Sequence, residues 1–249
     1  MLEIQDHGAI REIRLARPPA NALNGELVNA LAGALQTAGT EAEAVVVSAA
    51  GRMFCAGLDV PELLQLNRSH FAVLWRDFIG LTQTIATLPV PTVFAMQGHA
   101  VAGGLLLALF ADYRIMPAGA FKTGLNEVQV GLVAPTPVHR ALVRLVGPQR
   151  AERMLVSGEV MATEKAHAIG LVDELAGMPE EVVPAAVAWG TRHLALPRRA
   201  LNLSRQMARA DLHAIFDDYS ARENESWVDL WFEENTQAIL NELVASLGK

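Results

Sequence analysis

Residues 44–59 read AVVVSAAGRMFCAGLD and residues 92–105 read TVFAMQGHAVAGGL, and the two stretches share one plan. Each begins with a short run rich in β-branched or aromatic residues, which is typical of a buried parallel strand. Each then continues into a turn that contains glycine. Between them, residues 69–88 show the pattern of a helix that ends at Pro89 and Pro91. A strand, a glycine turn and a helix follow one another, which predicts an α/β fold with right-handed crossovers.

The rest of the chain extends this alternation on its N-terminal side and replaces it by helices on its C-terminal side. Outside the quoted stretches we expect strands at 13–15 and 113–116, and helices after Asn24, over 105–111 and, beyond Pro135, over 137–146, 149–156, 163–169, 180–195, 198–209 and 212–246. We therefore expect an α/β core over residues 1–190 and a C-terminal helical region over residues 191–249.

Composition narrows the class of protein. With 249 residues, of which 51% are hydrophobic and 19% charged, the chain can bury about 70% of its surface, which excludes a disordered or fibrous protein. A net charge of -7 without a run of Lys or Arg argues against nucleic acid as a partner. The longest apolar run, residues 100–111, is too short for a membrane helix, and the first residues do not resemble a secretory signal. We expect a cytoplasmic protein that does not bind membranes.

Several common site motifs do not occur in the sequence, namely GxGxxG, the P-loop, GxSxG, HExxH and CxxC. The seven histidines lack the spacing of metal ligands, so no metal site is expected. The single cysteine, Cys55, excludes an internal disulfide. Since no His or Asp pattern accompanies it, we expect Cys55 to be a small buried apolar residue and not a nucleophile.

The two glycine turns, residues 55–59 and 102–105, are the candidate site. Ligands of open α/β sheets lie beyond the carboxyl ends of the strands, where small residues let backbone N–H groups approach closely. The second turn also opens a helix, whose partial positive charge favours an oxygen that becomes negative. Two such turns aimed at one oxygen would form an oxyanion hole. Glycines that merely satisfy a backbone angle would give the same spacing, which leaves both interpretations open.

At this point the motifs resemble those of a known family. RMFCAGLDV at 52–60 and QGHAVAGGLLLALFADYRI at 97–115 resemble the two oxyanion-hole motifs of the crotonase superfamily, the acyl-CoA hydratases and isomerases. GLNEVQVGLVAP at 124–135, PPANALN at 18–24 and RAERML at 150–155 resemble most closely the mitochondrial-type 3,2-trans-enoyl-CoA isomerases. The resemblance covers nearly the whole chain and weakens in the last forty residues. It implies the ββα spiral fold, coenzyme A thioester substrates, and a homotrimer or a dimer of trimers.

The resemblance also implies roles for individual residues. The backbone N–H groups of Ala56 and Gly103 would bind the thioester oxygen, and Glu127 occupies the position of the family's catalytic glutamate. The residues expected to contact the coenzyme A substrate are Ala22, Leu23, Ala56, Gly57, Leu58, Asp59, Gly103 and Gly104. No cofactor is expected beyond this coenzyme A, and residues 191–249 would form the trimerisation region.

Leu106 is the informative departure from the family pattern. Hydratases of the superfamily carry a second glutamate at this position. Adding water to a double bond requires activating the water and delivering a proton, which those enzymes share between two carboxylates. Moving a double bond from position 3 to position 2 requires one base, which takes a proton from C2 and returns it to C4. The sequence therefore favours an isomerase.

The immediate neighbours of Glu127 are apolar: Leu125, Val128, Val130 and Leu132. Such neighbours predict an apolar pocket that raises the pKa of the Glu127 carboxyl towards the working pH. A carboxylate with a raised pKa is a stronger base.

Other side chains allow two interpretations each. Asp59 is expected to cap a helix that starts near Pro61, with a catalytic role as the alternative. Asn126 could orient the substrate or Glu127, or only structure its loop. Arg17 or Arg52 could meet the phosphates of coenzyme A, although most arginines are simply solvated.

Trp227 and Trp231 lie one helical turn apart and form an apolar stripe with Phe232. Core packing or a subunit interface is the expected role of this stripe. Contact with an acyl chain is the alternative.

The leading hypothesis is thus an enoyl-CoA isomerase with Glu127 as its base. A hydratase, or another crotonase-type reaction such as decarboxylation, is the second hypothesis, and Leu106 argues against hydration. A catalytically inactive acyl-CoA-binding protein is the third. Activity towards a panel of acyl-CoA thioesters distinguishes the three.

Overall fold

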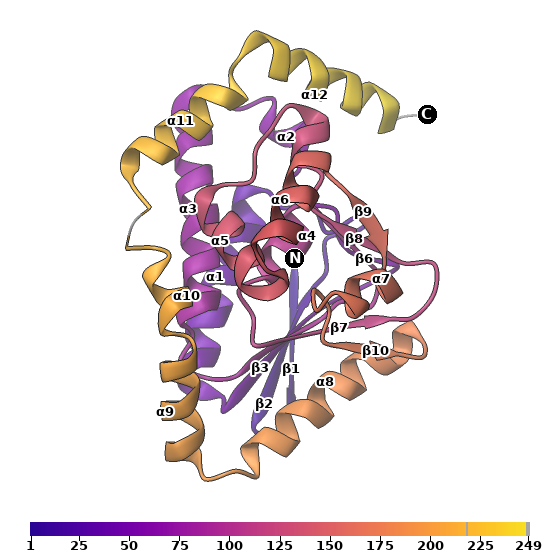
Figure 1. Cartoon of the computed structure of the whole chain (residues 1–249), viewed down its shortest axis with the longest axis vertical. Helices are drawn as coiled ribbons and strands as arrows, with labels where there is room; N and C mark the ends of the chain where they lie inside the picture. Colours follow the sequence, from indigo (N-terminus) through magenta and orange to yellow (C-terminus); the bar gives the residue numbers. More distant parts are fainter. Residues whose placement is uncertain (218, 248–249) are drawn as a thin grey trace.

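The computed structural model describes residues 1–217 and 219–247. Its strands and helices alternate up to β10 and are followed by helices alone (Figure 1). The helices are α1 (Gly25–Glu41), α2 (Val60–Leu63), α3 (Arg68–Thr87), α4 (Gly103–Ala108), the 3₁₀ helix η1 (Glu127–Val130), α5 (Thr136–Val146), α6 (Pro148–Ser157), α7 (Thr163–Ala168), α8 (Pro179–Leu194), α9 (Arg198–Ala208), α10 (Ala210–Ala214), α11 (Ala221–Trp231) and α12 (Glu234–Leu247).

The larger sheet has the strand order β1-β2-β3-β5-β7-β10. Its strands are β1 (Leu2–His7), β2 (Ile10–Leu15), β3 (Ala44–Ala49), β5 (Thr92–Ala95), β7 (Tyr113–Pro117) and β10 (Glu174–Ala176). Only the β1–β2 hairpin is antiparallel; the other neighbours are parallel. The expected strands at 13–15, 44–48, 92–97 and 113–116 are therefore confirmed, and all belong to this one sheet.

A smaller sheet has the order β4-β6-β8-β9. Its strands are β4 (Met53–Cys55), β6 (His99–Val101), β8 (Lys122–Gly124) and β9 (Val160–Ala162). Along the chain β3 leads into β4, β5 into β6, and β7 into β8, and a helix follows each pair. This repeated β-β-α unit confirms the α/β class and the ββα spiral that the motifs predict. Strands of three residues show no periodicity, which is why the sequence did not reveal them.

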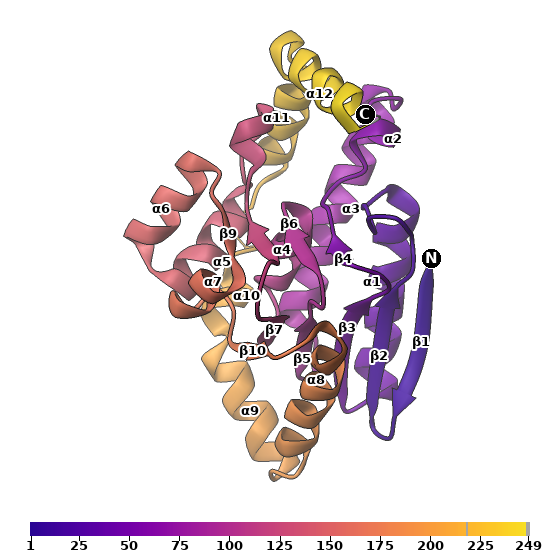
Figure 2. The same cartoon turned by 90° about the vertical axis from the view of Figure 1, so that its right-hand side faces the viewer.

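The larger sheet is buried on both faces. Val45 and Val47 of β3 pack towards α1 and α3, whereas Ala44 and Val46 pack towards α8. Figure 2 shows α1 and α8 on either side of these strands. Because both faces are covered, β3 is apolar throughout and shows no alternation. The carboxyl ends of β3 and β5, from which the glycine turns emerge, are thus held in a rigid core.

The C-terminal helices share the core of the rest of the chain. Leu212, Trp227, Trp231 and Leu240 are buried in the same hydrophobic cluster as the strands. In Figure 1, α11 and α12 lie at one end of the molecule, where α11 packs against α3. The single helix expected over 212–246 is wrong, because α10, α11 and α12 occupy this range. Residue 218, inside that range, and residues 248–249, inside the region 191–249, lie outside the described residues.

Two arginines, Arg205 in α9 and Arg209 at its C-terminal end, bind groups of the core. The Arg209 guanidinium donates to the carbonyls of Ala86 at 3.1 Å and Phe110 at 2.6 Å, which lie at the ends of α3 and α4. Arg205 forms an ion pair with Asp112, with Nε to Oδ1 at 2.8 Å. Carbonyls in the last turn of a helix accept no hydrogen bond from their own helix. Arg209 therefore donates to carbonyl groups that would otherwise be buried without partners.

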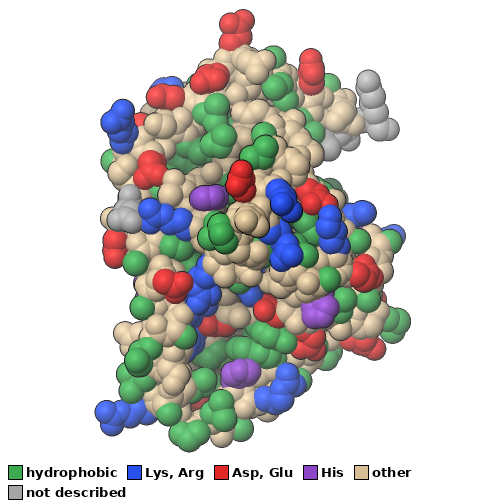
Figure 3. Space-filling model, viewed as in Figure 1, with side chains coloured by type: hydrophobic (Ala, Val, Ile, Leu, Met, Phe, Trp, Pro, Cys, Tyr) green, Lys and Arg blue, Asp and Glu red, His purple; other side chains and the backbone are tan. Residues whose placement is uncertain are grey.

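The surface seen in Figure 3 carries Lys and Arg side chains interspersed with Asp and Glu. Hydrophobic side chains lie between them. No helix within residues 1–217 and 219–247 is both long and apolar enough to cross a membrane.

Candidate active site

The two glycine turns contact each other. Gly57 has a φ of +95°, a conformation that favours glycine. A Cβ atom added at Gly57 would lie 2.9 Å from the Ala102 Cβ atom and 3.1 Å from the Gly103 nitrogen. Gly57 is therefore required both by its backbone angle and by the close approach of the second turn. This contact supports the interpretation that the two turns form one site, and it disfavours the alternative that each glycine only satisfies a local backbone angle.

The direction of each backbone N–H in the first turn can be read from the hydrogen bonds around it. The Ala56 N–H donates to the Ala20 carbonyl at 3.0 Å. Leu23 forms an isolated parallel bridge with Leu58: the Leu23 N–H donates to the Gly57 carbonyl at 2.8 Å, and the Asp59 N–H donates to the Leu23 carbonyl at 3.0 Å. In this parallel bridge the Gly57 carbonyl and the Asp59 N–H face Leu23, so the N–H of Leu58, which lies between them, points the other way. The Leu58 N–H has no hydrogen-bond partner among the described residues.

The role expected for the Ala56 N–H is wrong. Ala56 is not a free donor, because its N–H is already bonded within the protein. The free donor of the first turn is Leu58, two residues later, which lines the same cavity. Gly57, with its positive φ, lies between the two residues and changes the direction of the backbone. The N–H groups of Ala56 and Leu58 therefore point in different directions. The sequence showed the glycine but not its φ, so it could not show which amide is free.

The second turn presents the N–H of Gly103. Gly103 is the first residue of α4, and the first N–H groups of a helix have no acceptor within it. Ala102, which precedes it, has a φ of +47°, a rare conformation for a residue with a Cβ atom. Strained backbone of this kind is concentrated at functional sites, where the fold holds it in place.

Glu127 reaches the same cavity from η1. Its Oε2 atom is buried and has no hydrogen-bond partner among the described residues. Burial raises the pKa of Glu127 to about 7, from an ordinary value of 4.5. This agrees with the expected apolar pocket, to which Val130 and Leu132 contribute, whereas Leu125 and the 44% exposed Val128 do not line the cavity. A carboxyl group with a pKa near neutrality can accept and return a proton at physiological pH.

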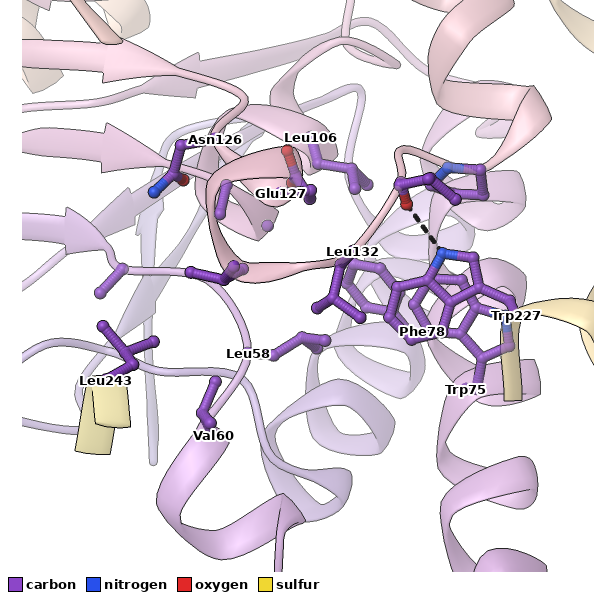
Figure 4. A pocket seen from close by; sticks show the side chains of 16 residues that line it. Leu58, Val60, Trp75, Phe78, Leu106, Asn126, Glu127, Leu132, Trp227 and Leu243 are labelled. Carbon is purple, nitrogen blue, oxygen red and sulfur yellow. Dashed lines mark hydrogen bonds between the residues drawn. The ribbon is translucent and has the colours of Figure 1, made fainter. Parts of the chain in front are cut away.

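The cavity around these groups has a volume of about 100 Å³. The residues that line it are Ala56, Leu58, Val60, Trp75, Phe78, Ala102, Gly103, Leu106, Asn126, Glu127, Val130, Leu132, Val133, Pro135, Trp227 and Leu243. Within the part of the chain that the structure describes, Glu127 is the only ionisable side chain of this lining. Leu106, 3% exposed, lies beside it in Figure 4.

The other residues expected to contact coenzyme A surround the cavity without lining it. Gly104 is buried behind the turn, against the Cys55 carbonyl. Ala22 accepts a hydrogen bond at its carbonyl from Arg17 at 3.0 Å. Asp59 caps α2 by accepting from the Glu62 N–H at 3.2 Å, which confirms the expected cap. Their contacts with coenzyme A remain predictions.

Arg17 has its charge paired within the protein. Its guanidinium contacts the carboxylates of Asp59 at 2.6 Å and Glu62 at 3.0 Å. A phosphate would have to compete with both carboxylates for this arginine. Arg52 is exposed.

Cys55 and Asn126 can now be placed. Burial raises the pKa of the Cys55 thiol to about 12, so Cys55 is not a thiolate nucleophile. Asn126 lines the cavity, and its side chain makes no hydrogen bond with the described residues. A purely structural role for the Asn126 side chain therefore has no contact to support it.

The tryptophan stripe divides into two roles. Trp231 is fully buried and stacks on Phe71, with ring centroids 4.4 Å apart, which confirms core packing. Trp227 also packs in the core, on Trp75, but in addition it lines the cavity. Helical spacing identified the stripe and could not show that its first member faces the site.

Comparisons with known proteins give the family. The model of the enoyl-CoA hydratase/isomerase family matches residues 5–237. The probable enoyl-CoA hydratase echA17 of Mycobacterium avium (strain 104) is 35% identical over 205 residues, which cover 82% of this chain and 77% of the relative. The mitochondrial enoyl-CoA delta isomerase 1 of Mus musculus is 31% identical over 214 residues, 84% of this chain and 73% of the relative.

A solved structure gives the same answer. The crystal structure of human mitochondrial delta3-delta2-enoyl-CoA isomerase superposes with a TM-score of 0.93 at 26% identity, covering 99% of this chain and 98% of that chain. The resemblance that the motifs carry is therefore confirmed. The chain belongs to the enoyl-CoA hydratase/isomerase family of the crotonase superfamily.

Proposed function

We propose that this enzyme shifts the double bond of a 3-enoyl-CoA thioester to the 2-trans position. The observation that carries the proposal is the presence of one carboxylate, Glu127, in a cavity where Leu106 occupies the place beside it. One base suffices for a shift of a double bond. The similarity to the mouse and human isomerases supports the same reaction.

In the proposed reaction the Glu127 carboxylate removes a proton from C2 of the bound thioester. The electrons of the broken C–H bond move towards the carbonyl, whose oxygen becomes negative. The N–H groups of Leu58 and Gly103 donate to this oxygen, and each such donor is worth about 2.7 to 4 kcal/mol in comparable sites. Glu127 then returns the proton to C4, and the double bond lies between C2 and C3. No proton or electron is gained or lost, so no further cofactor is proposed.

Hydration is the second candidate, because the 35% identical relative is named a probable enoyl-CoA hydratase. A water molecule would have to be deprotonated and a second proton delivered to C2. Glu127 is the only ionisable group of the described cavity lining that could do either. We therefore place isomerisation first. A homotrimer or dimer of trimers remains a proposal based on the family resemblance, and a cytoplasmic location remains a proposal based on the sequence.

The test is the conversion of a 3-enoyl-CoA to its conjugated 2-enoyl product, followed by absorbance. The Glu127→Gln variant keeps the size of the side chain and removes the base, so kcat is expected to fall by about 10² to 10⁴-fold while binding of a saturated acyl-CoA is retained. Glu26→Gln, an exposed acid on α1, is the control and should leave kcat unchanged. Unchanged turnover in Glu127→Gln would disprove the role of the base. Faster hydration of 2-enoyl-CoA than isomerisation would favour the second candidate.

A further inference from the structure

The Trp227 indole is fixed in place from two directions. Trp227 is 5% exposed, and its ring stacks on Trp75, with centroids 3.4 Å apart and an angle of 7° between the planes. Its Nε1 atom donates to the Val133 carbonyl at 2.8 Å, the hydrogen bond drawn in Figure 4. Because Trp75 holds the face of the ring and Val133 holds its Nε1 edge, the ring can form a rigid boundary of a pocket.

A second cavity shares part of its lining with the site cavity. It has a volume of about 160 Å³. Its lining consists of Val133, Ala134, Pro135, Thr136, Tyr219, Glu223, Ser226, Trp227 and Leu230. Val133, Pro135 and Trp227 also line the cavity of Glu127. Trp227 therefore contributes to the partition between the two cavities.

The two ends of the site cavity differ in their lining, and Val133, whose carbonyl accepts from Trp227, is 51% exposed. In Figure 4, Leu58 lies between Val60 and Leu243 on one side and the aromatic rings on the other. Val60 and Leu243 are half-buried, whereas Trp75 and Trp227 are buried. A thioester that is held at the Leu58 N–H and enters past Val60 and Leu243 directs its acyl chain towards the aromatic end.

We propose that Trp227 is the end wall of the acyl pocket and restricts this enzyme to short acyl chains. The inference rests on the proposed function, because it names the substrate class of the same site. The volume of about 100 Å³ on the Glu127 side supports it, since ligand pockets usually measure about 300 to 1,000 Å³. A long chain can be accommodated only where the wall is removed.

The second cavity can accept an apolar chain once it is opened. Its polar side chains already have partners: Thr136 Oγ1 donates to Glu223 at 2.6 Å, and the Tyr219 hydroxyl donates to Asn224 at 3.0 Å. An acyl chain in this cavity would therefore not leave these polar groups buried without hydrogen-bond partners. Leu230 and Pro135 supply apolar surface for the chain.

The test measures the binding of hexanoyl-CoA and dodecanoyl-CoA by calorimetry in the full-length protein and its Trp227→Val variant. Wild type is expected to bind hexanoyl-CoA more tightly. In Trp227→Val the ratio of the two Kd values should shift towards dodecanoyl-CoA by at least about tenfold, which corresponds to the burial of two methylene groups. If Trp227→Val does not fold, Trp227→Leu, which keeps more apolar volume against Trp75, serves the same purpose.

Two controls separate the wall from other effects. Trp227→Phe loses the hydrogen bond to Val133 and keeps a ring, so its ratio should stay near that of wild type. Leu230→Ala enlarges the second cavity behind an intact wall and should leave the ratio unchanged. Equal shifts in Trp227→Phe and Trp227→Val would overturn the proposal, as would tighter binding of dodecanoyl-CoA by wild type. Binding does not require catalysis, so the expected shift without turnover of any 3-enoyl-CoA would support the wall and disprove the isomerase reaction.

Discussion

Glu127 and Leu106 line one cavity, and this leucine lies beside the only carboxylate among the described lining residues. Leucine cannot carry charge or transfer protons. Burial in the apolar cavity that Leu106 helps to line raises the pKa of Glu127 to about 7. In the proposed isomerisation, Glu127 is therefore the group that transfers the proton, at a pH set by its burial.

The activity should depend on pH through Glu127. Its carboxylate form is the base, so kcat/KM is expected to fall about tenfold per unit as the pH drops below about 7 and to be constant above it. A profile of kcat/KM for 3-enoyl-CoA isomerisation measures the pKa in the free enzyme. An inflection near the ordinary value of 4.5 would show that the carboxyl group is solvated in solution.

The same pKa predicts how stability changes with pH. The pKa of Glu127 is higher in the folded chain than in the unfolded chain, so the folded state binds more protons between pH 4.5 and about 7. This stabilising contribution is complete below pH 4.5 and is lost as the pH rises through about 7. Glu127→Gln has no such loss.

Urea unfolding of Glu127→Gln and wild type, below pH 4.5 and above pH 7, measures this difference. The variant should gain stability relative to wild type across that window, by an amount on the order of 3 kcal/mol. Parallel stability curves for the two proteins would contradict the raised pKa.

Much of this site could be predicted because its signals are local. The apolar runs at 44–48 and 92–97 are buried on both faces, and glycine follows each one, so strand and turn were both visible. Leu106 was informative for a chemical reason, since a single position decides whether a second proton-transfer group is present.

The remainder depends on geometry that spacing does not encode. The free amide of the first turn belongs to Leu58 because Gly57 has a positive φ. Arg209 is 5% exposed because it binds carbonyls at the ends of two distant helices, which no local pattern indicates. Trp227 faces the site because α11 packs on α3. Each of these follows from contacts between segments that are far apart in the sequence.

Introducing a second acid beside Glu127 should alter the reaction. Leu106→Glu supplies a group that can activate water or deliver a proton, so hydration of 2-enoyl-CoA is expected to appear. Two neighbouring carboxyl groups disfavour each other's charge, which should move the pH dependence of isomerisation above about 7. Loss of the conjugated absorbance of a 2-enoyl-CoA measures the hydration. Leu106→Gln, similar in size but unable to titrate, should not hydrate, and equal hydration by both variants would refute the requirement for a second acid.

Replacing Ala102 by glycine should stabilise the fold, whereas replacing alanine by glycine usually destabilises it. Ala102 has a φ of +47° and directs the Gly103 N–H, so Ala102→Gly should relieve strain of about 1 to 3 kcal/mol. Glycine also makes the unfolded chain more flexible, at a cost of about 0.4 to 1 kcal/mol, which leaves a net gain of about 1 kcal/mol in urea unfolding. Ala100→Gly, in strand β6 and without a positive φ, should instead lose about 1 to 2 kcal/mol, because it makes the unfolded chain more flexible and also removes a buried methyl group. If both variants are destabilised alike, the fold does not hold Ala102 under strain, and the Gly103 amide owes its direction to the helix alone.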